Sequence, residues 1–233
     1  MPRSMEGRHV VITGGSGALG GAVAARFAAA GAICHLPVRS MPEQAAFEAG
    51  PNIVAVEGID LTRQEDVDRF YEGVPDLWAS IHAAGGFAMG AVVDTSLDDF
   101  RRMIEINAAT AFACCRAAAR NMRANGIEGR IVNVAARPGL DPRRGARTTA
   151  YTASKAAIVA LTMALAEELK DDRILVNAVA PSTLDTPTNR AQMPNADTSK
   201  WVTLKAAAET IFYLGSPANM AASGTVIPLY GRA

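Results

Sequence analysis

The chain has 233 residues, and 49% of them are hydrophobic, which is enough for one α/β domain with a sizeable core. Its 23 basic and 23 acidic residues balance, which argues against nucleic acid or an anionic membrane surface as the main partner. Cys34, Cys114 and Cys115 are odd in number and lack metal-ligand spacing, so they predict a reducing compartment and no metal site. Residues 1–8 contain no apolar signal segment, and no apolar run approaches the roughly 20 residues of a membrane span. We therefore expect a soluble cytoplasmic protein.

Short β-branched runs alternate with alanine-rich helical stretches along the whole chain. Buried strands are expected at residues 9–12, 33–38, 53–56, 77–83, 130–134, 174–180 and 225–229. Helices are expected at residues 18–30, from 96 to about 125, at 151–169 and at 203–214. Ser96 and Asp99 have the spacing of a capping box at the start of the second of these helices, and Gly126 marks its end.

This alternation predicts βαβ units in a doubly wound, mainly seven-stranded parallel sheet with helices on both faces. Strands that are apolar on both faces fit such a sheet. No linker or repeat interrupts the pattern, so residues 1–233 are interpreted as a single domain. Two longer irregular segments, 137–150 and 182–200, follow strands and therefore lie at the carboxyl edge, where ligands bind in such folds. The second is predicted to be a substrate loop or lid over about 182–202.

A glycine-rich turn joins the first strand to the first helix. Its sequence is Thr-Gly-Gly-Ser-Gly-Ala-Leu-Gly over residues 13–20. Gly14 permits a tight turn, the missing side chains let backbone N–H groups face a phosphate, and the helix adds its positive end. A plain βα turn is the alternative, but the strand–turn–helix context favours a nucleotide site. The predicted phosphate contacts are Gly14, Ser16, Gly17, Ala18 and Leu19.

The residue that closes the second strand should meet the adenosine ribose of a dinucleotide. An acid at this position would bind a 2′-hydroxyl and repel a 2′-phosphate. The sequence here is Leu-Pro-Val-Arg-Ser over residues 36–40, with no acid and one arginine, Arg39. A planar, bidentate guanidinium suits a phosphate, so NADP(H) is favoured over NAD(H). A solvated arginine at a strand end remains the alternative.

Tyr151 and Lys155 lie at positions i and i+4 of a predicted helix and so share one face. The ordinary tyrosine pKa, near 10, is too high for easy proton exchange at neutral pH. A nearby ammonium would lower that pKa and make Tyr151 a usable acid or base. This spacing alone is common in surface pairs, so its meaning depends on the other motifs.

Taken together, these motifs resemble the short-chain dehydrogenase/reductase family over nearly the whole chain. The further matching elements are Asp60-Leu61, Ala84-Gly85, Asn107 within Ile-Asn-Ala, and Asn-Ala-Val-Ala-Pro ending at Pro181. The resemblance implies a Rossmann-type fold, a small-molecule substrate and NAD(P)H-dependent hydride transfer with Tyr151 as proton donor or relay. It also implies a homodimer or homotetramer.

The resemblance further implies a role for each matching residue. Asp60 would contact the adenine amino group, and Asn107 would hold a water in a proton relay to Lys155. Lys155 would also bind the nicotinamide ribose. Leu184 and Thr186 would contact the carboxamide and the pyrophosphate. The other residues assigned to the cofactor are Leu61, Ala84, Gly85, Tyr151 and Pro181.

The chain departs from the family pattern at several positions. His82 and Ala83 stand where the family has two asparagines, and Ala18 replaces a glycine. The serine that polarises the substrate carbonyl is missing: Ala135 and Ala136 follow the 130–134 strand, and the usual spacing to Tyr151 falls on Pro138. Thr148 and Thr149 are the candidate substitutes.

A second resemblance concerns residues 183–197 and Trp201, which are similar to the corresponding loop of quinoid dihydropteridine reductases. Those enzymes also keep the Tyr/Lys pair and lack the serine. The leading prediction is therefore reduction of a quinonoid pterin-like acceptor. The same loop would equally fit a broader bacterial subgroup that acts on other substrates. The alternatives are an ordinary ketone or alcohol of the 3-oxoacyl type and, in a different class, a non-catalytic NADP(H)-sensing regulator.

Four arginines, at positions 137, 143, 144 and 147, crowd the segment before Tyr151, with only Asp141 to balance them. They could attract an anionic substrate through a focused positive field. The simpler interpretation, a solvated or subunit-contact loop, is favoured.

Overall fold

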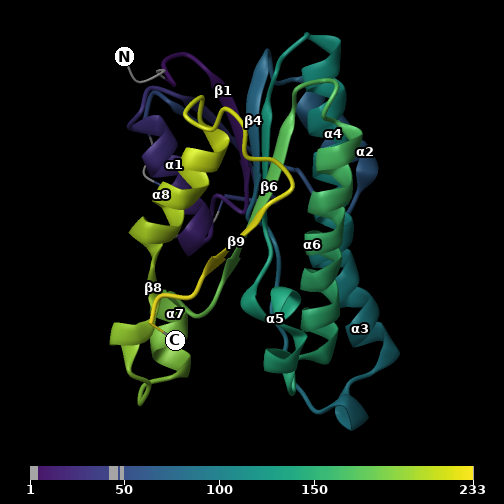
Figure 1. Cartoon of the computed structure of the whole chain (residues 1–233), viewed down its shortest axis with the longest axis vertical. Coiled ribbons are helices and arrows are strands. Elements are labelled where there is room, and N and C mark those ends of the chain that lie inside the picture. The colour runs from purple at the N-terminus through teal and green to yellow at the C-terminus, as the bar shows by residue number, and fades with distance from the viewer. Residues whose placement is uncertain (1–4, 42–46, 48–49, 233) are drawn as a thin grey trace.

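Seven strands form one parallel sheet at the centre of the computed structural model, which describes residues 5–41, 47 and 50–232 (Figure 1). The strand order is β3-β2-β1-β4-β5-β6-β9. The strands are β1 (His9–Thr13), β2 (Ile33–Pro37), β3 (Ile53–Val56), β4 (Leu77–His82), β5 (Arg130–Val134), β6 (Leu175–Pro181) and β9 (Val226–Leu229). The order reverses between β1 and β4, so a crevice for ligands is expected where these two strands end.

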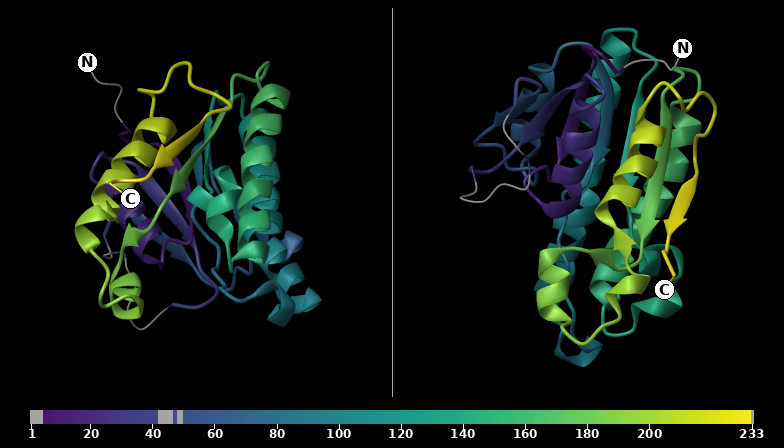
Figure 2. Two further views of the ribbon diagram at one scale, coloured as in Figure 1. Left: turned by 60° about the horizontal axis from the view of Figure 1, so that its bottom comes forward. Right: turned by 90° about the vertical axis from the view of Figure 1, so that its left-hand side faces the viewer.

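Helices cover both faces of the sheet. One face carries α1 (Ala18–Ala28) and α8 (Leu204–Gly215), and the other carries α2 (Gln64–Glu72), α4 (Thr110–Ala124) and α6 (Thr149–Glu168) (Figure 1). Three shorter helices lie beyond the carboxyl edge: α3 (Leu97–Met103), α5 (Arg137–Leu140) and α7 (Pro187–Gln192). A small two-stranded sheet, β7 (Leu184–Asp185) with β8 (Val202–Thr203), joins α7 to the rest (Figure 2).

The two large hydrophobic cores lie on opposite faces of the sheet because successive strand residues point to opposite sides. In β1, Val10 packs into the core under α1 and α8, whereas Val11 packs into the core under α2, α4 and α6. Both side chains are fully buried. The prediction that the strands are buried on both faces holds for the central strands, whereas the edge strands β3 and β9 are only partly buried. Among the described helices α6 alone is long and apolar enough to span a membrane, and it packs here against β6.

The predicted fold class is confirmed, with differences in four segments. Helix α2 was not predicted. The helix expected over 96–125 starts with the predicted capping box and stops before Gly126, which has a φ of +63°. A π-helical turn at Ile104–Ala109 divides it into α3 and α4. The segments expected to be irregular contain short helices, α5 in one and α7 in the other.

Candidate active site

The glycine-rich turn fits closely against the end of β4. Gly14 has a φ of +70°, and a Cβ atom there would lie 2.6 Å from the backbone nitrogen of Ala84. A Cβ on Gly20 would lie 2.1 Å from the carbonyl oxygen of Gly14. Thr13 Oγ1 accepts a hydrogen bond from Ala84 N at 3.2 Å. Side chains are therefore excluded where β1, α1 and the end of β4 meet, at the expected crevice.

The N-terminus of α1 offers backbone donors to this crevice. Gly17 is the N-cap and supplies no side-chain acceptor for the first N–H groups of the helix. Gly17 itself is exposed, Ser16, Ala18 and Leu19 are partly exposed, and nothing but a backbone oxygen lies near a Cβ built on Gly17. Free donors at the positive end of an 11-residue helix fit a dinucleotide pyrophosphate.

Arg39 and Asp60, predicted to contact opposite ends of the adenosine, lie together. Arg39 Nη2 is 3.2 Å from Asp60 Oδ1, and the same oxygen accepts from the backbone and hydroxyl of Thr62. These hydrogen bonds from Thr62, with a smaller contribution from Arg39, lower the pKa of Asp60. The Arg39 side chain is 75% exposed, so its guanidinium can turn toward a ligand. Leu61 follows directly and is partly buried.

The π-helical turn places Asn107 inside the fold. Its side chain is fully buried and clamps the strand extension after β4: Oδ1 accepts from Gly86 N at 3.0 Å, and Nδ2 donates to Gly86 O at 3.1 Å. Nδ2 also donates to Ser154 Oγ on α6 at 3.1 Å. A Cβ on Gly85 would lie 2.4 Å from Asn107 Oδ1 and 3.5 Å from Lys155 Nζ. Asn107 thus holds Gly85 and Gly86 beside Lys155. Its expected role in holding a water of the proton relay stays a prediction.

Tyr151 and Lys155 both lie in the first part of α6. Lys155 is 5% exposed, and its Nζ donates to Val134 O, at the end of β5, at 2.8 Å. An ammonium has three donors, so two remain for a ribose. Burial lowers the pKa of Lys155 to about 8. The Tyr151 ring packs edge-on against Phe87, with ring centroids 5.0 Å apart.

Burial acts on Tyr151 in the direction opposite to the sequence-based expectation. Desolvation raises the pKa of Tyr151 to about 12. Lys155 Nζ lies 5.9 Å from the ring centroid and does not reverse this shift. The phenol is therefore protonated at neutral pH. This is the form that donates a proton during reduction.

The end of β5 carries no hydroxyl group where the family has its serine. Ala136 is 5% exposed and caps α5, whose second residue is Pro138. Thr148 Oγ1 donates to Gly145 O at 3.1 Å and contacts Thr152 Oγ1 at 3.3 Å, so it is engaged away from Tyr151. The hydrogen bonds of the described residues include none to the Tyr151 hydroxyl. Of the two candidate substitutes, only the exposed Thr149 is left without such an engagement.

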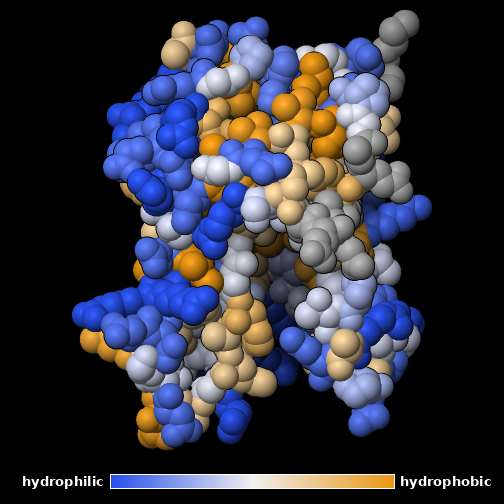
Figure 3. Space-filling view, turned by 180° about the vertical axis from the view of Figure 1, so that it is seen from behind, coloured by the Kyte–Doolittle hydropathy of each residue, from blue (hydrophilic) through white to orange (hydrophobic). Residues whose placement is uncertain are grey.

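The predicted substrate segment begins at the buried end of β6, Pro181. Leu184 is half-buried in β7 and pairs with Val202. The Thr186 hydroxyl accepts from Asn189 N at 3.1 Å and caps α7, so it is already engaged. Figure 3 shows the molecule hollowed between two lower lobes, one on the α7 side and one on the α3 side.

A pocket of about 220 Å³ opens between α3 and the first residues of α6. Its lining includes Met89, Asp94, Asp99, Arg147 and Thr149. A larger pocket of about 300 Å³ lies between α2 and α4 and contains none of the predicted site residues.

A buried chain of hydrogen bonds connects β4, β5 and α6 behind the site. Tyr71 OH contacts Ser80 Oγ at 2.8 Å, and Ser80 Oγ contacts His82 Nε2 at 2.8 Å. His82 Nδ1 contacts Asn133 Oδ1 at 2.8 Å, and Asn133 Nδ2 donates to Thr162 Oγ1 at 3.0 Å. This network of hydrogen bonds holds together the ends of β4 and β5, where Ala84 and Val134 border the site.

The profile of the family described as short chain dehydrogenase matches residues 8–197. This chain belongs to the short-chain dehydrogenase/reductase family. It is 31% identical to 3beta-hydroxysteroid dehydrogenase 1 of Eggerthella lenta, over 94% of this chain and 85% of the relative. It is 32% identical to a sorbitol dehydrogenase of Cereibacter sphaeroides, over 78% of this chain and 72% of the relative. A short-chain type dehydrogenase/reductase from Mycobacterium ulcerans superimposes with a TM-score of 0.88 at 25% identity, covering 98% and 90% of the two chains.

Membership shows that the chain is an oxidoreductase of the NAD(P)-dependent short-chain dehydrogenase/reductase type. Three residues of the site were not singled out from the sequence: Phe87, Ser154 and Gly139. A Cβ on Gly139 would lie 2.6 Å from the backbone of Lys155, so this glycine lets α5 pack directly on the lysine. The Pro-Gly pair at residues 138–139 was the available signal for it. The contacts of Phe87 and Ser154 are tertiary and have no local signature.

Proposed function

We propose that this chain reduces an activated, conjugated acceptor with NADPH and that Tyr151 donates the proton. The bound cofactor would supply a hydride. Backbone donors from Ser16 to Leu19 would hold its pyrophosphate, and Lys155 would hold its nicotinamide ribose. Arg39 would face the 2′-phosphate and Asp60 the adenine. Tyr151 carries its proton at neutral pH, as the proton donor of a reduction must.

The observation that carries the choice of acceptor is Ala136. Reduction of an unactivated ketone builds negative charge on oxygen, and a second donor beside the tyrosine stabilises it. Losing one such donor typically costs about 3 kcal/mol, or roughly 10²–10³ in rate. A quinonoid acceptor spreads the charge over a conjugated system and becomes aromatic on reduction, so it depends less on that donor. A quinonoid dihydropterin is one such acceptor.

A second candidate is the reduction of a ketone or oxidation of an alcohol. The names of relatives favour it: a hydroxysteroid dehydrogenase, a sorbitol dehydrogenase and a 3-hydroxyacyl-CoA dehydrogenase all act on such groups by name. In this case Thr149 would be the first side chain to examine as a replacement donor. A third possibility, sensing of NADP(H) without turnover, gives no reason for Tyr151 beside the buried Lys155.

The test is NADPH oxidation measured with quinonoid dihydropterin, quinones, imines and simple ketones, in the wild type and in Ala136→Ser. We expect quinonoid acceptors to exceed simple ketones in kcat/KM. We also expect Ala136→Ser to raise ketone activity more than quinonoid activity. Efficient wild-type ketone reduction with no quinonoid activity would favour the second candidate. Binding of NADPH with no turnover on any acceptor would favour the sensor.

A further inference from the structure

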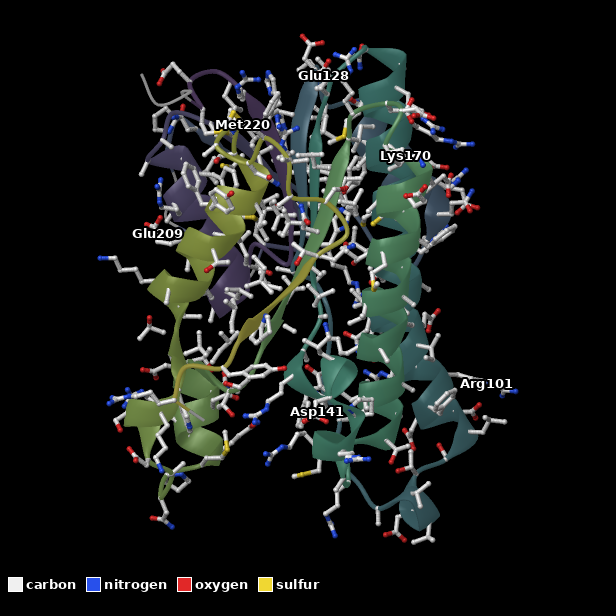
Figure 4. The ribbon with its side chains drawn as sticks, viewed as in Figure 1. Arg101, Glu128, Asp141, Lys170, Glu209 and Met220 are labelled. Atoms are coloured by element: carbon white, nitrogen blue, oxygen red, sulfur yellow. The ribbon has the colours of Figure 1, made fainter. Side chains whose placement is uncertain are left out.

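One of the four arginines in the 137–147 segment has surroundings unlike those of the other three. Arg144 pairs with Asp141 at 3.7 Å, which uses the only acid of the segment. Asp141 lies beside α5 at the lower end of the molecule (Figure 4). Arg143 and Arg147 are exposed. Arg137 differs because its side chain is partly buried, and it forms no ion pair within 4 Å among the described residues.

The guanidinium of Arg137 lies over the ring of Tyr230, 4.6 Å from the ring centroid. Arg137 Nε is cut off from solvent and has no hydrogen-bond partner, and it is the only such side-chain atom in the described part of the chain. The two terminal nitrogens also lack described hydrogen bonds but are not cut off in this way, so they are open to solvent. A cation that has given up part of its hydration without a counter-charge is costly, and an anion would offset that cost.

Arg137 lies between α6, the helix that carries Tyr151 and Lys155, and the predicted substrate segment at 182–202. It directly follows Ala136, and Gly139, two residues later, packs on Lys155. On the other side, Ser182 Oγ donates to Tyr230 O at 3.1 Å, and Arg232 N donates to Lys200 O at 3.2 Å. An anion held by Arg137 therefore lies at the carboxyl edge of the sheet, with Tyr230 behind the guanidinium and the 182–202 segment beside it.

We propose that Arg137 binds a carboxylate of the substrate, so that the physiological substrate carries an anionic group beside the group that is reduced. The stacked, planar guanidinium presents its two terminal nitrogens to one carboxylate, which is the bidentate geometry that arginine favours. This inference rests on the proposed function, because it assigns a substrate to the same site. It makes Arg137 a specificity residue that acts in binding.

A binding experiment tests the carboxylate site without turnover. Calorimetric titration of benzoate and of benzamide, at one ionic strength and with and without saturating NADP⁺, compares a carboxylate with a neutral group of similar shape. We expect the wild type to prefer benzoate and Arg137→Met to bind benzoate about 10- to 100-fold more weakly, the range expected for a lost charge-assisted hydrogen bond. Benzamide binding should not change. Arg137→Lys should retain part of the preference.

Arg143→Met is the matched control, because it removes the same charge from an exposed position of the same segment. It should bind both probes as the wild type does. If Arg143→Met weakened benzoate binding equally, the effect would come from the overall positive charge of the segment, and the proposed site would be wrong. The site would also be wrong if the wild type did not distinguish benzoate from benzamide. A parallel loss of NADPH affinity in Arg137→Met would assign the guanidinium to the cofactor instead.

Turnover separates this inference from the proposed function. With 4-carboxybenzaldehyde and 4-carbamoylbenzaldehyde as a matched pair, Arg137→Met should raise KM only for the acid. If neither aldehyde nor any other acceptor is reduced, the proposed function fails, while the benzoate titration still decides the anion site. If both KM values rise equally, Arg137 acts only in folding of the segment and the inference is wrong.

Discussion

Lowering the pH should destabilise this protein through His82. Burial lowers the pKa of His82 to about 4, from an ordinary value of 6.5. The unfolded chain therefore binds a proton between pH 6.5 and 4 that the folded chain rejects, and stability falls as pH falls through this window. One pKa unit corresponds to about 1.4 kcal/mol, so the contribution lost between pH 7.5 and 4.5 is about 2.5 kcal/mol.

Desolvation lowers the pKa of His82, and the hydrogen bond to Asn133 partly opposes this shift. The neighbouring side chains fix which ring nitrogen carries the proton. Thr162 Oγ1 donates to Ile158 O and so accepts from Asn133, which turns Asn133 Oδ1 toward His82 Nδ1. The imidazole then carries its proton on Nδ1, and Nε2 accepts from Ser80.

Other groups in this network keep their protons over the same pH range. Burial raises the pKa of Tyr71, next to Ser80, and that of Cys115, which lies 3.5 Å from His82 Nδ1. Within this network, the pH dependence should therefore come from His82.

Urea unfolding at pH 7.5 and 4.5 measures the effect. His82→Asn introduces the residue that the family has here and removes the titration, so it should lose about 2.5 kcal/mol less stability than the wild type over this interval. His35, whose pKa burial and His9 also lower to about 4, is the matched control, and His35→Gln should remove its own share independently. Equal pH dependence in the wild type and His82→Asn would refute the argument from burial.

Four further results are expected at the active site. Tyr151→Phe keeps the ring against Phe87 and removes the proton donor, so steady-state kinetics should show a loss of about 10²–10⁴ in turnover, with the NADPH dissociation constant within a few-fold of wild type. The kcat/KM for reduction should fall above about pH 8, where Lys155 loses its proton, and a flat profile to pH 10 would contradict the role of its charge. Gly85→Ala should cost about 1–3 kcal/mol of unfolding free energy and reduce activity, because its Cβ would meet Asn107 Oδ1. Arg39→Gln should raise the dissociation constant of NADPH and leave that of NADH unchanged. Equal increases for both cofactors would show that Arg39 does not bind the 2′-phosphate.

The sheet was predictable because parallel strands are buried on both faces and leave uninterrupted apolar runs in the sequence. The predicted strands agree with the structure to within one or two residues. Helix α2 was missed although Val67, Phe70 and Tyr71 have the i, i+3, i+4 spacing of a buried helix face, and all three are buried. Its many charged residues, of which Glu65, Arg69 and Glu72 face solvent, obscured that pattern.

Other parts of the site depend on contacts that no local pattern encodes. The π-helical turn accompanies the hydrogen bonds between Asn107 and Gly86, which lie 21 residues apart. The pair of Arg39 with Asp60 spans the same separation. The direction of the Tyr151 pKa shift was wrong from sequence because helical spacing gives the proximity of Lys155 and says nothing about desolvation.

Ala136 and Arg137 are adjacent, and together they change how the site handles negative charge. A serine donor stabilises charge that appears on the substrate oxygen only in the transition state, so its absence lowers kcat. A guanidinium that binds a carboxylate already present in the ground state acts on KM, because that interaction is the same before and during the reaction. With alanine at 136 and arginine at 137, this chain would therefore select its substrate by charge and depend on the acceptor's own conjugation for reactivity. The two effects separate in kinetics: Ala136→Ser should act mainly on kcat for simple ketones, and Arg137→Met mainly on KM for acids.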